Sequence, residues 1–274
     1  MKTLTVNGTH IPVLGFGTYG MSGPSLQKVL VEALKGGFRH IDTAQIYKNE
    51  DDVGVAISAS GIPRKNVFIT TKVWVSNYFP EHFMASVDES LRRLKTDYID
   101  LLLAHWPRGG APLEAQIEGL NEAASRGKTR HIGVSNFNAS MLNAAIALSE
   151  RPIVTNQVEY HPYLDQSRLL KEINKQETSL MAYCAMAIGK VFKEPLLKEI
   201  ADRHKRSISQ IVLRWLIQQP GVVTLSRTAR IERIPENLAI FDFALDEQEM
   251  RSISALHEKN SRIVNPAGLS PDWD

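Results

Sequence analysis

Apolar and polar positions along the 274-residue chain follow two alternating periods. Short apolar runs rich in β-branched residues, such as 67–73, are typical of buried strands. Between these runs apolar residues recur three and four positions apart, as at 26, 29, 30, 33 and 34, which predicts the buried face of a helix. Gly36 and Gly37 end that helix, because glycine readily adopts a left-handed C-cap conformation. The pattern therefore predicts strands and helices in alternation.

Strand-then-helix units repeat to the end of the chain. The predicted strands span 13–17, 38–42, 67–73, 98–106, 131–135, 153–159, 179–183 and 222–225. The predicted helices span 26–34, 49–60, 80–94, 113–125, 139–149, 167–175 and one long segment at 195–218, with further helices within 234–257. Eight units of about 34 residues favour a closed (β/α)8 TIM barrel of the α/β class over an open parallel sheet. We expect a single domain over 1–274 that starts with a short N-terminal hairpin turning at Asn7-Gly8.

The composition narrows the classes of function. A hydrophobic content of 43% and a net charge of +2 exclude a disordered chain and give no reason to expect a nucleic-acid partner. No apolar run approaches the ~18–20 residues of a membrane helix, and the N-terminus lacks the apolar core of a signal peptide, so we expect a cytoplasmic protein with no membrane partner. The single cysteine, Cys184, excludes an internal disulfide and a multi-cysteine metal site, and we expect no metal.

One glycine motif suggests a different fold. Gly15-Phe16-Gly17-Thr18-Tyr19-Gly20 matches G-x-G-x-x-G, and Asp42 follows near the position of a ribose-binding acid in a dinucleotide-binding sheet. In that fold the third glycine opens the helix that holds the pyrophosphate, whereas residues 21–24 here separate Gly20 from the first periodic position. No tyrosine is followed by a lysine four positions later, as the short-chain reductases require. A Rossmann dehydrogenase stays the less favoured alternative.

Three ionisable residues stand at the ends of consecutive predicted strands. They are Asp42, Lys72 and His105, spaced by about one repeat unit, and Tyr47 lies in the loop after Asp42. Functional groups of such barrels gather at the C-terminal ends of the strands, so the four side chains are expected to meet at one rim. Taken singly, each has an ordinary structural explanation: an N-cap, a solvated lysine, a histidine bonded to backbone and a rim aromatic. All four in register on adjacent strands favour a catalytic site.

These motifs resemble those of the aldo-keto reductases, and the similarity runs from Gly15 to the C-terminus. The matching segments are Gly15–Thr18, Ile41–Tyr47, Thr71–Trp74, Leu103–Pro107, Ile132–Phe137 and Asn156–Pro162. The resemblance implies an oxidoreductase that passes hydride from a nicotinamide to a carbonyl carbon.

The resemblance also implies a catalytic tetrad of Asp42, Tyr47, Lys72 and His105. Tyr47 would deliver a proton to the carbonyl oxygen, and the Lys72 ammonium would lower the pKa of that phenol. Asp42 would hold Lys72 in place, and His105 would bond and orient the substrate oxygen.

A nicotinamide cofactor would lie across the barrel mouth. The implied contacts are Gly17, Thr18, Asp42, Ser135, Asn136, Gln157, Tyr183, Arg227, Thr228, Arg233, Glu236 and Asn237. Ser135, Asn136 and Gln157 would bond the carboxamide, and Tyr183 would stack on the ring. Guanidinium groups of Arg227 and Arg233 on a phosphate favour NADPH over NADH. The chain departs from the family at 226–228, where Pro-Lys-Ser is usual, and at 184–190, where Ser-Pro-Leu-Gly is usual.

The substrate pocket would be walled by aromatic residues. The implied substrate contacts are Tyr19, Tyr47, Trp74, His105 and Trp106. The tail at 262–274 and the loop at 184–190 are similar to those of bacterial B-type 2,5-diketo-D-gluconate reductases, which implies a small polar carbonyl such as 2,5-diketo-D-gluconate or methylglyoxal. We expect a monomer. A cofactor-binding scaffold without catalysis, like the potassium-channel β subunits that share this barrel, is the alternative from a different class.

Overall fold

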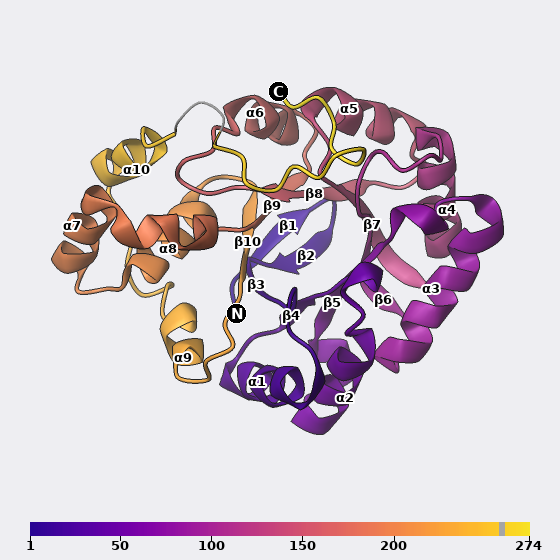
Figure 1. The fold of residues 1–274 in the computed structure, drawn as a ribbon, viewed down its shortest axis with the longest axis horizontal. Coiled ribbons are helices and arrows are strands. Elements are labelled where there is room, and N and C mark those ends of the chain that lie inside the picture. The colour runs from indigo at the N-terminus through magenta and orange to yellow at the C-terminus, as the bar shows by residue number, and fades with distance from the viewer. Residues whose placement is uncertain (258–260) are drawn as a thin grey trace.

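The computed structural model describes residues 1–257 and 261–274, and its centre is a closed barrel of eight parallel strands (Figure 1). The barrel strands are β3 (Leu14–Gly17), β4 (His40–Asp42), β5 (Phe68–Val73), β6 (Ile99–Ala104), β7 (Thr129–Ser135), β8 (Ile153–Glu159), β9 (Ser179–Tyr183) and β10 (Val222–Ser226). They follow chain order around the barrel, and β10 closes it against β3. The predicted (β/α)8 barrel is confirmed, and closure excludes the open sheet of the Rossmann alternative.

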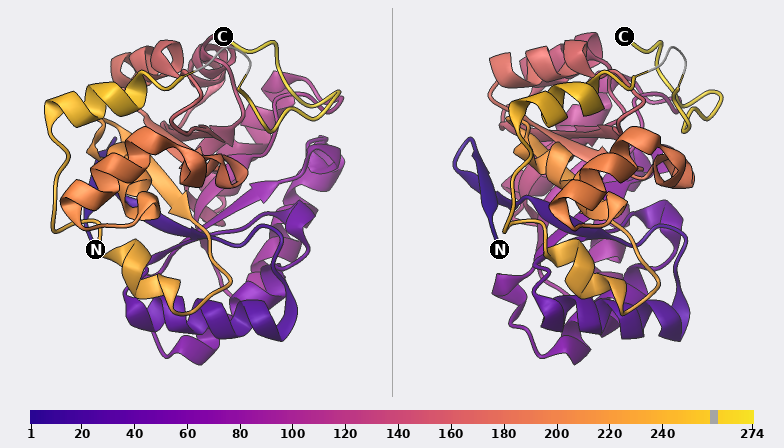
Figure 2. Two further views of the ribbon diagram at one scale, coloured as in Figure 1. Left: turned by 60° about the vertical axis from the view of Figure 1, so that its left-hand side comes forward. Right: turned by 90° about the vertical axis from the view of Figure 1, so that its left-hand side faces the viewer.

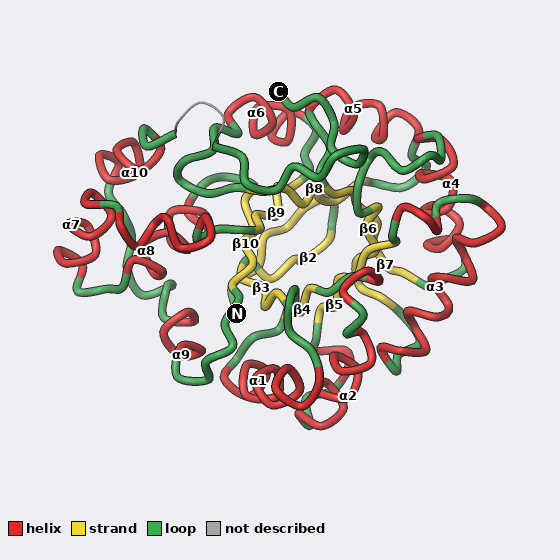
Figure 3. Tube along the Cα trace, viewed as in Figure 1, coloured by secondary structure: helices red, strands yellow, loops and turns green. Residues whose placement is uncertain are grey.

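Helices form the outer layer around the strands (Figure 3). They are α1 (Gly23–Gly36), α2 (Glu50–Ser60), α3 (Pro80–Leu94), α4 (Leu113–Ser125), α5 (Ala139–Leu148), α6 (Ser167–Lys175), α7 (Pro195–His204), α8 (Ile208–Gln218), α9 (Arg233–Leu238) and α10 (Glu247–Ser254). Four 3-10 turns complete the described elements: η1 (Gln45–Tyr47), η2 (Arg64–Asn66), η3 (Val75–Asn77) and η4 (Ala187–Lys193). The apolar stripe predicted for α1 is buried, and Gly37 ends the helix with φ +121°.

The single helix predicted over 195–218 is wrong, because two helices occupy that segment. Lys205 ends α7 in a left-handed conformation with φ 52°. Ser207 then caps α8: its side chain accepts from the Gln210 amide, and the Gln210 side chain accepts from the Ser207 amide. This reciprocal capping box leaves a three-residue gap between helices that share one periodic stripe, so periodicity alone overlooks the break.

The predicted N-terminal hairpin is present and closes one end of the barrel. Strands β1 (Thr3–Val6) and β2 (Thr9–Pro12) pair through a turn in which Asn7 and Gly8 have φ 45° and 76°. Val6 and Ile11 pack on apolar side chains that fill the barrel interior. The hairpin and the C-terminal tail lie at opposite ends of the barrel (Figure 2, right).

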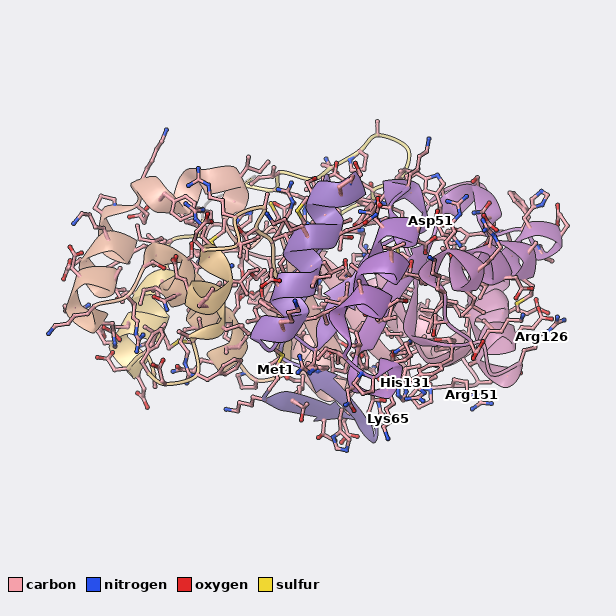
Figure 4. All side chains as sticks on the ribbon, turned by 90° about the horizontal axis from the view of Figure 1, so that it is seen from below. Met1, Asp51, Lys65, Arg126, His131 and Arg151 are labelled. Carbon is pink, nitrogen blue, oxygen red and sulfur yellow. The ribbon has the colours of Figure 1, made fainter. Side chains whose placement is uncertain are left out.

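The hairpin end also carries a surface hollow. It has a volume of about 250 Å³ and is lined in part by Lys65, Asp100, Arg130 and His131. Lys65 and His131 are labelled beside the hairpin in Figure 4. This end lies away from the C-terminal strand ends, where barrel enzymes place their chemistry.

Candidate active site

The four predicted catalytic side chains come together at the C-terminal ends of β4, β5 and β6. Asp42 ends β4, Lys72 lies near the end of β5, His105 follows β6, and Tyr47 ends η1. Lys72 Nζ donates to Asp42 Oδ1 at 2.7 Å and lies 5.0 Å from the centre of the Tyr47 ring. The Tyr47 and His105 rings meet edge to face, with centroids 5.7 Å apart. The spacing of strand ends therefore predicted a real cluster.

Asp42 and Lys72 form a buried ion pair. The Lys72 side chain is fully enclosed and that of Asp42 is 4% exposed. Lys72 Nζ also donates to the Thr43 carbonyl at 2.8 Å. Burial lowers the pKa of Lys72, and the Asp42 carboxylate acts in the opposite direction. The Lys72 charge therefore lies beneath the Tyr47 ring, and the Asp42 carboxylate compensates that charge.

The pKa of Tyr47 moves opposite to the expected direction. Burial raises the pKa of this phenol well above its usual range, and the negative charge of Asp42 raises it further. The expected net lowering of this pKa is therefore wrong for the protein as described, because desolvation, the largest cause, disfavours the phenolate. Tyr47 is consequently protonated at neutral pH, which is the state that a proton donor needs.

His105 is neutral in the same surroundings. His105 is only 7% exposed, and this burial lowers the pKa of its imidazole well below the usual range. The positive charge of Lys72 lowers that pKa further. Within the described residues its enclosed Nδ1 has no hydrogen-bond partner. A neutral ring can donate one hydrogen bond to a substrate oxygen without adding a second charge beside Lys72.

A hydrogen-bond chain connects Asp42 to residues expected at the nicotinamide. The second Asp42 oxygen, Oδ2, accepts from Gln157 Nε2 at 2.7 Å. The Gln157 carbonyl accepts from Ser135 Oγ at 2.8 Å and from the Asn136 amide at 2.9 Å. β4, β7 and β8 are thereby joined at the barrel mouth.

Asn136 extends this chain toward His105 and Tyr183. Its Nδ2 donates to the His105 carbonyl at 2.9 Å, and its Oδ1 accepts from the Tyr183 hydroxyl at 2.7 Å. Asn136 has φ 65°, a left-handed conformation that asparagine tolerates better than most residues. Ser135, Asn136, Gln157 and Tyr183 thus lie in one network with the catalytic candidates.

The segment after β3 is held by a residue that the sequence analysis missed. Thr18 Oγ1 donates to the Asp42 carbonyl at 2.9 Å and ties this segment to β4. The space beside Gly17 is open, since a Cβ added there would have no neighbour closer than 3.9 Å. Asn49, buried before α2, donates to the carbonyls of Thr18 and Met21 at 3.0 and 2.9 Å. A polar residue two positions after Tyr47 at a predicted helix start was the available signal.

The aromatic rim is only partly open. Tyr19 is 66% exposed, with its ring centroid 5.0 Å from that of Tyr47. The Trp74 and His105 ring centroids are 5.3 Å apart. Trp106 is 5% exposed, and its backbone is fixed by the buried Tyr78 hydroxyl, which contacts both Trp106 N and O. Tyr19 and Trp74 therefore offer more accessible surface than Trp106.

Exposed arginines follow β10 at the other side of the mouth. A Cβ at Gly20 would lie 3.2 Å from Arg227 Nη2, so this guanidinium sits over the turn after β3. Across the part of the chain that the structure describes, neither Arg227 nor Arg233 forms an ion pair. Uncompensated guanidinium groups fit a phosphate-bearing cofactor.

The other expected adenosine contacts lie on the same segment. Thr228 is buried and its hydroxyl bonds the Arg230 backbone, while Asn237 Nδ2 donates to Ser226 Oγ at 2.7 Å. Glu236 is half-buried on α9. Thr228 and Asn237 are thus held by internal hydrogen bonds, and Asn237 is joined to the end of β10.

The divergent loop after Tyr183 is conformationally unusual. Cys184, Ala187 and Ile188 have φ 57°, 45° and 49°, a left-handed region that costs side chains about 1 kcal/mol or more each. The Cys184 thiol is half-buried, and burial raises its pKa to about 11. It therefore stays protonated at neutral pH, and a thiol is a much weaker nucleophile than a thiolate.

Residues 1–257 and 261–274 contain no group of three or more His, Cys, Asp or Glu side chains arranged to hold a metal ion. No helix among them is long and apolar enough to cross a membrane.

Comparison with known proteins shows what the chain is similar to. Residues 13–258 match the model of the Aldo/keto reductase family. The chain is 38% identical over 267 residues to the methylglyoxal reductase DkgB of Escherichia coli O157:H7, covering 96% of this chain and 99% of the relative. It is 39% identical over 267 residues to the glyoxal reductase of Bacillus subtilis (strain 168), covering 97% and 94% of the two chains. A crystal structure provisionally named a 2,5-diketo-D-gluconic acid reductase B superposes with a TM-score of 0.99 at 55% identity, covering 100% of this chain and 98% of the other.

Proposed function

This chain belongs to the aldo/keto reductase family, and from that premise we propose that it is an NADPH-dependent reductase of small polar aldehydes and ketones. The observation that carries the proposal is the cluster of Tyr47, His105 and the buried Asp42–Lys72 pair at the barrel mouth. The proposal takes residues 1–274 as one reductase domain that acts as a cytoplasmic monomer; sedimentation and cell fractionation test the last two points.

Each catalytic candidate has a role that its surroundings support. NADPH, when bound, supplies the hydride that reduces the carbonyl carbon. The protonated Tyr47 hydroxyl then provides the proton for the carbonyl oxygen, and the Lys72 charge beneath the ring stabilises the phenolate that is left. Neutral His105 orients the same oxygen by a hydrogen bond. Asp42 holds Lys72 and, through Gln157, aligns the nicotinamide side of the site.

The preference for NADPH rests on the basic segment after β10. Arg227 and Arg233 would hold the 2′-phosphate, with Thr228 beside it, while Glu236 and Asn237 would contact the adenine. Gly17, Thr18, Ser135, Asn136, Gln157 and Tyr183 would receive the nicotinamide half. Exposed guanidiniums without an acid partner support this assignment, since each can bind phosphate with paired hydrogen bonds.

The substrate class follows from the relatives and from the rim. Methylglyoxal, glyoxal and 2,5-diketo-D-gluconate are named with the similar proteins, and all are small polar carbonyl compounds. Tyr19, Trp74 and Trp106 would wall the pocket around Tyr47 and His105. Tyr19 and Trp74 give stacking surface beside few polar groups, which suits a compact substrate.

Replacing Tyr47 by Phe tests the proposed role of the phenol. We expect Tyr47→Phe to lower kcat for methylglyoxal with NADPH by at least about a hundredfold, because proton transfer loses its donor. The Kd for NADPH should stay within about threefold of the unmodified protein, since the hydroxyl acts on the substrate. Loss of absorbance at the NADPH band and fluorescence titration give the two values.

Tyr98→Phe is the matched control, because its buried hydroxyl has no hydrogen-bond partner among the described residues and lies on the strand end remote from the mouth. Retained turnover in Tyr47→Phe would contradict the assigned role. Tight NADPH binding without turnover of any carbonyl by the unmodified protein would favour the non-catalytic scaffold.

A further inference from the structure

The C-terminal tail crosses the barrel mouth and is fastened near both of its ends. Near its start, the Ile263 and Val264 amides donate to the two carboxylate oxygens of Glu159, both at 2.8 Å. At its end, Asp274 Oδ2 accepts from the Ala139 amide at the start of α5 at 2.7 Å. In Figure 1 the yellow tail passes over the strand ends next to β8 and β9. The tail is therefore a fixed wall of the mouth.

Arg262 stands next to the first fastening point. Glu159 ends β8 and pairs in register with Tyr183, so the Ile263 amide fixes the backbone next to Arg262 at the rim where β8 and β9 end, and the charge of Glu159 acts on Arg262. Its guanidinium stacks on the Trp273 ring, with the central carbon 3.5 Å from the ring centroid. The stack joins the two ends of the tail and holds the cation in one orientation.

The hydrogen-bonding capacity of Arg262 is unmet. The side chain is half-buried, it forms no ion pair within the described chain, and its enclosed Nη1 has no acceptor there. The nearby Glu159 carboxylate already accepts from two tail amides and from His161 Nε2 at 2.9 Å. Burial lowers the pKa of Arg262, although a guanidinium still keeps its charge at neutral pH. A desolvated guanidinium with unsatisfied donors is costly until an acceptor arrives.

We propose that Arg262 determines specificity by binding the carboxylate of an anionic carbonyl substrate whose reacting carbon lies at Tyr47 and His105. A carboxylate matches the planar fork of a guanidinium and supplies the acceptors that the protein does not. The substrate class is then oxo acids, in preference to uncharged carbonyls of the same size. This inference rests on the proposed reductase function and adds the charge of the substrate to it.

A pair of aldehydes that differ only in the group at the far end of the chain tests the proposal. 4-Oxobutanoate and butanal have the same chain length, and only the first carries a carboxylate. We expect Arg262→Met to lower kcat/KM for 4-oxobutanoate by about 10- to 100-fold, through KM, because a charge-assisted hydrogen bond is lost. For butanal the change should stay within about twofold. Arg262→Lys should lie between the two, since it keeps the charge and loses the fork.

Arg168→Met is the matched control for tail anchoring, because Arg168 pairs with Asp274 at 3.5 Å and is 71% exposed. It should leave the selectivity between the two aldehydes unchanged. Limited proteolysis of the tail reports whether Arg262→Met stays fastened.

Equal losses for both aldehydes in Arg262→Met would overturn the proposal and make Arg262 a structural clamp. Binding of succinate, a non-reducible dicarboxylate, by the NADPH complex gives a readout independent of turnover. If the unmodified protein binds succinate and Arg262→Met does not, the carboxylate site is supported, even if neither aldehyde is reduced. Absence of aldehyde reduction would then refute only the proposed reductase function. Succinate binding equal in both proteins would overturn the site.

Discussion

The buried pair of Asp42 and Lys72 makes the sharpest energetic prediction. Asp42→Asn would remove the counter-charge of the fully enclosed Lys72 ammonium, and the single amide oxygen of asparagine could not accept from both Lys72 Nζ and Gln157 Nε2 as the two carboxylate oxygens do. Removing one partner of a buried ion pair costs about 3–5 kcal/mol of stability. The cost has a ceiling, because Lys72 can release its proton: at pH 7 that takes about 5 kcal/mol for a lysine of ordinary pKa. We therefore expect a loss of about 3–5 kcal/mol at pH 7.

The pH dependence of that loss identifies its cause. Without Asp42, the main group that raises the pKa of Lys72 is gone and burial lowers that pKa. Below the ordinary lysine pKa the folded variant therefore holds fewer protons than the unfolded chain. Stability of the variant then rises with pH toward that value, by up to about 1.4 kcal/mol per pH unit. Urea unfolding of both proteins at pH 7 and pH 9, followed by circular dichroism, should show the penalty shrinking by about 1–3 kcal/mol.

The double variant Asp42→Asn/Lys72→Met completes the cycle. It buries no unpaired charge, so its stability should exceed that of Asp42→Asn at pH 7 by at least about 1 kcal/mol, although both variants should be inactive. A penalty for Asp42→Asn below about 1 kcal/mol, unchanged between pH 7 and 9, would refute the description of this pair as desolvated and coupled.

Three further predictions address the core, the cofactor and helix packing. Burial lowers the pKa of His40 from 6.5 to about 4, so the unfolded chain takes up a proton at this residue between pH 6.5 and 4 while the folded protein does not. The free energy of unfolding should therefore fall by roughly 3 kcal/mol as the pH drops from 6.5 to 4. Parallel unfolding titrations of His40→Gln should lack this loss. Arg233→Ala should raise the Kd for NADPH at least about tenfold and that for NADH less than about twofold; equal effects would remove Arg233 from the phosphate site. Gly54→Ala would place Cβ 2.6 Å from the Arg93 carbonyl oxygen and should lower the free energy of unfolding by about 1–3 kcal/mol in thermal denaturation. Gly36→Ala is the control: its Cβ would lie 3.1 Å from a side-chain methyl of Ile234, and the free energy of unfolding should change by less than about 1 kcal/mol.

The local pattern of apolar and polar residues predicted most of the strands and helices. Strand and helix periods depend on which side chains avoid water over a few residues, and β8, α4 and α6 begin and end where the periodicity predicted. The break between α7 and α8 was lost because one apolar stripe continues across it, although Ser207 and Gln210 carry a capping signal. The meeting of Asp42, Lys72 and His105 was also predictable, since ends of neighbouring parallel strands share one rim.

Tertiary structure decided the electrostatics and the long-range contacts. The direction of the Tyr47 pKa depends on how completely distant segments exclude water from the phenol, and no spacing in the chain reports that. Likewise Arg262 meets Trp273, and Glu159 meets the tail, only because the last residues return across the mouth. Periodicity and strand order are written locally in side-chain hydrophobicity, whereas desolvation and the partners of a charge are properties of the folded volume.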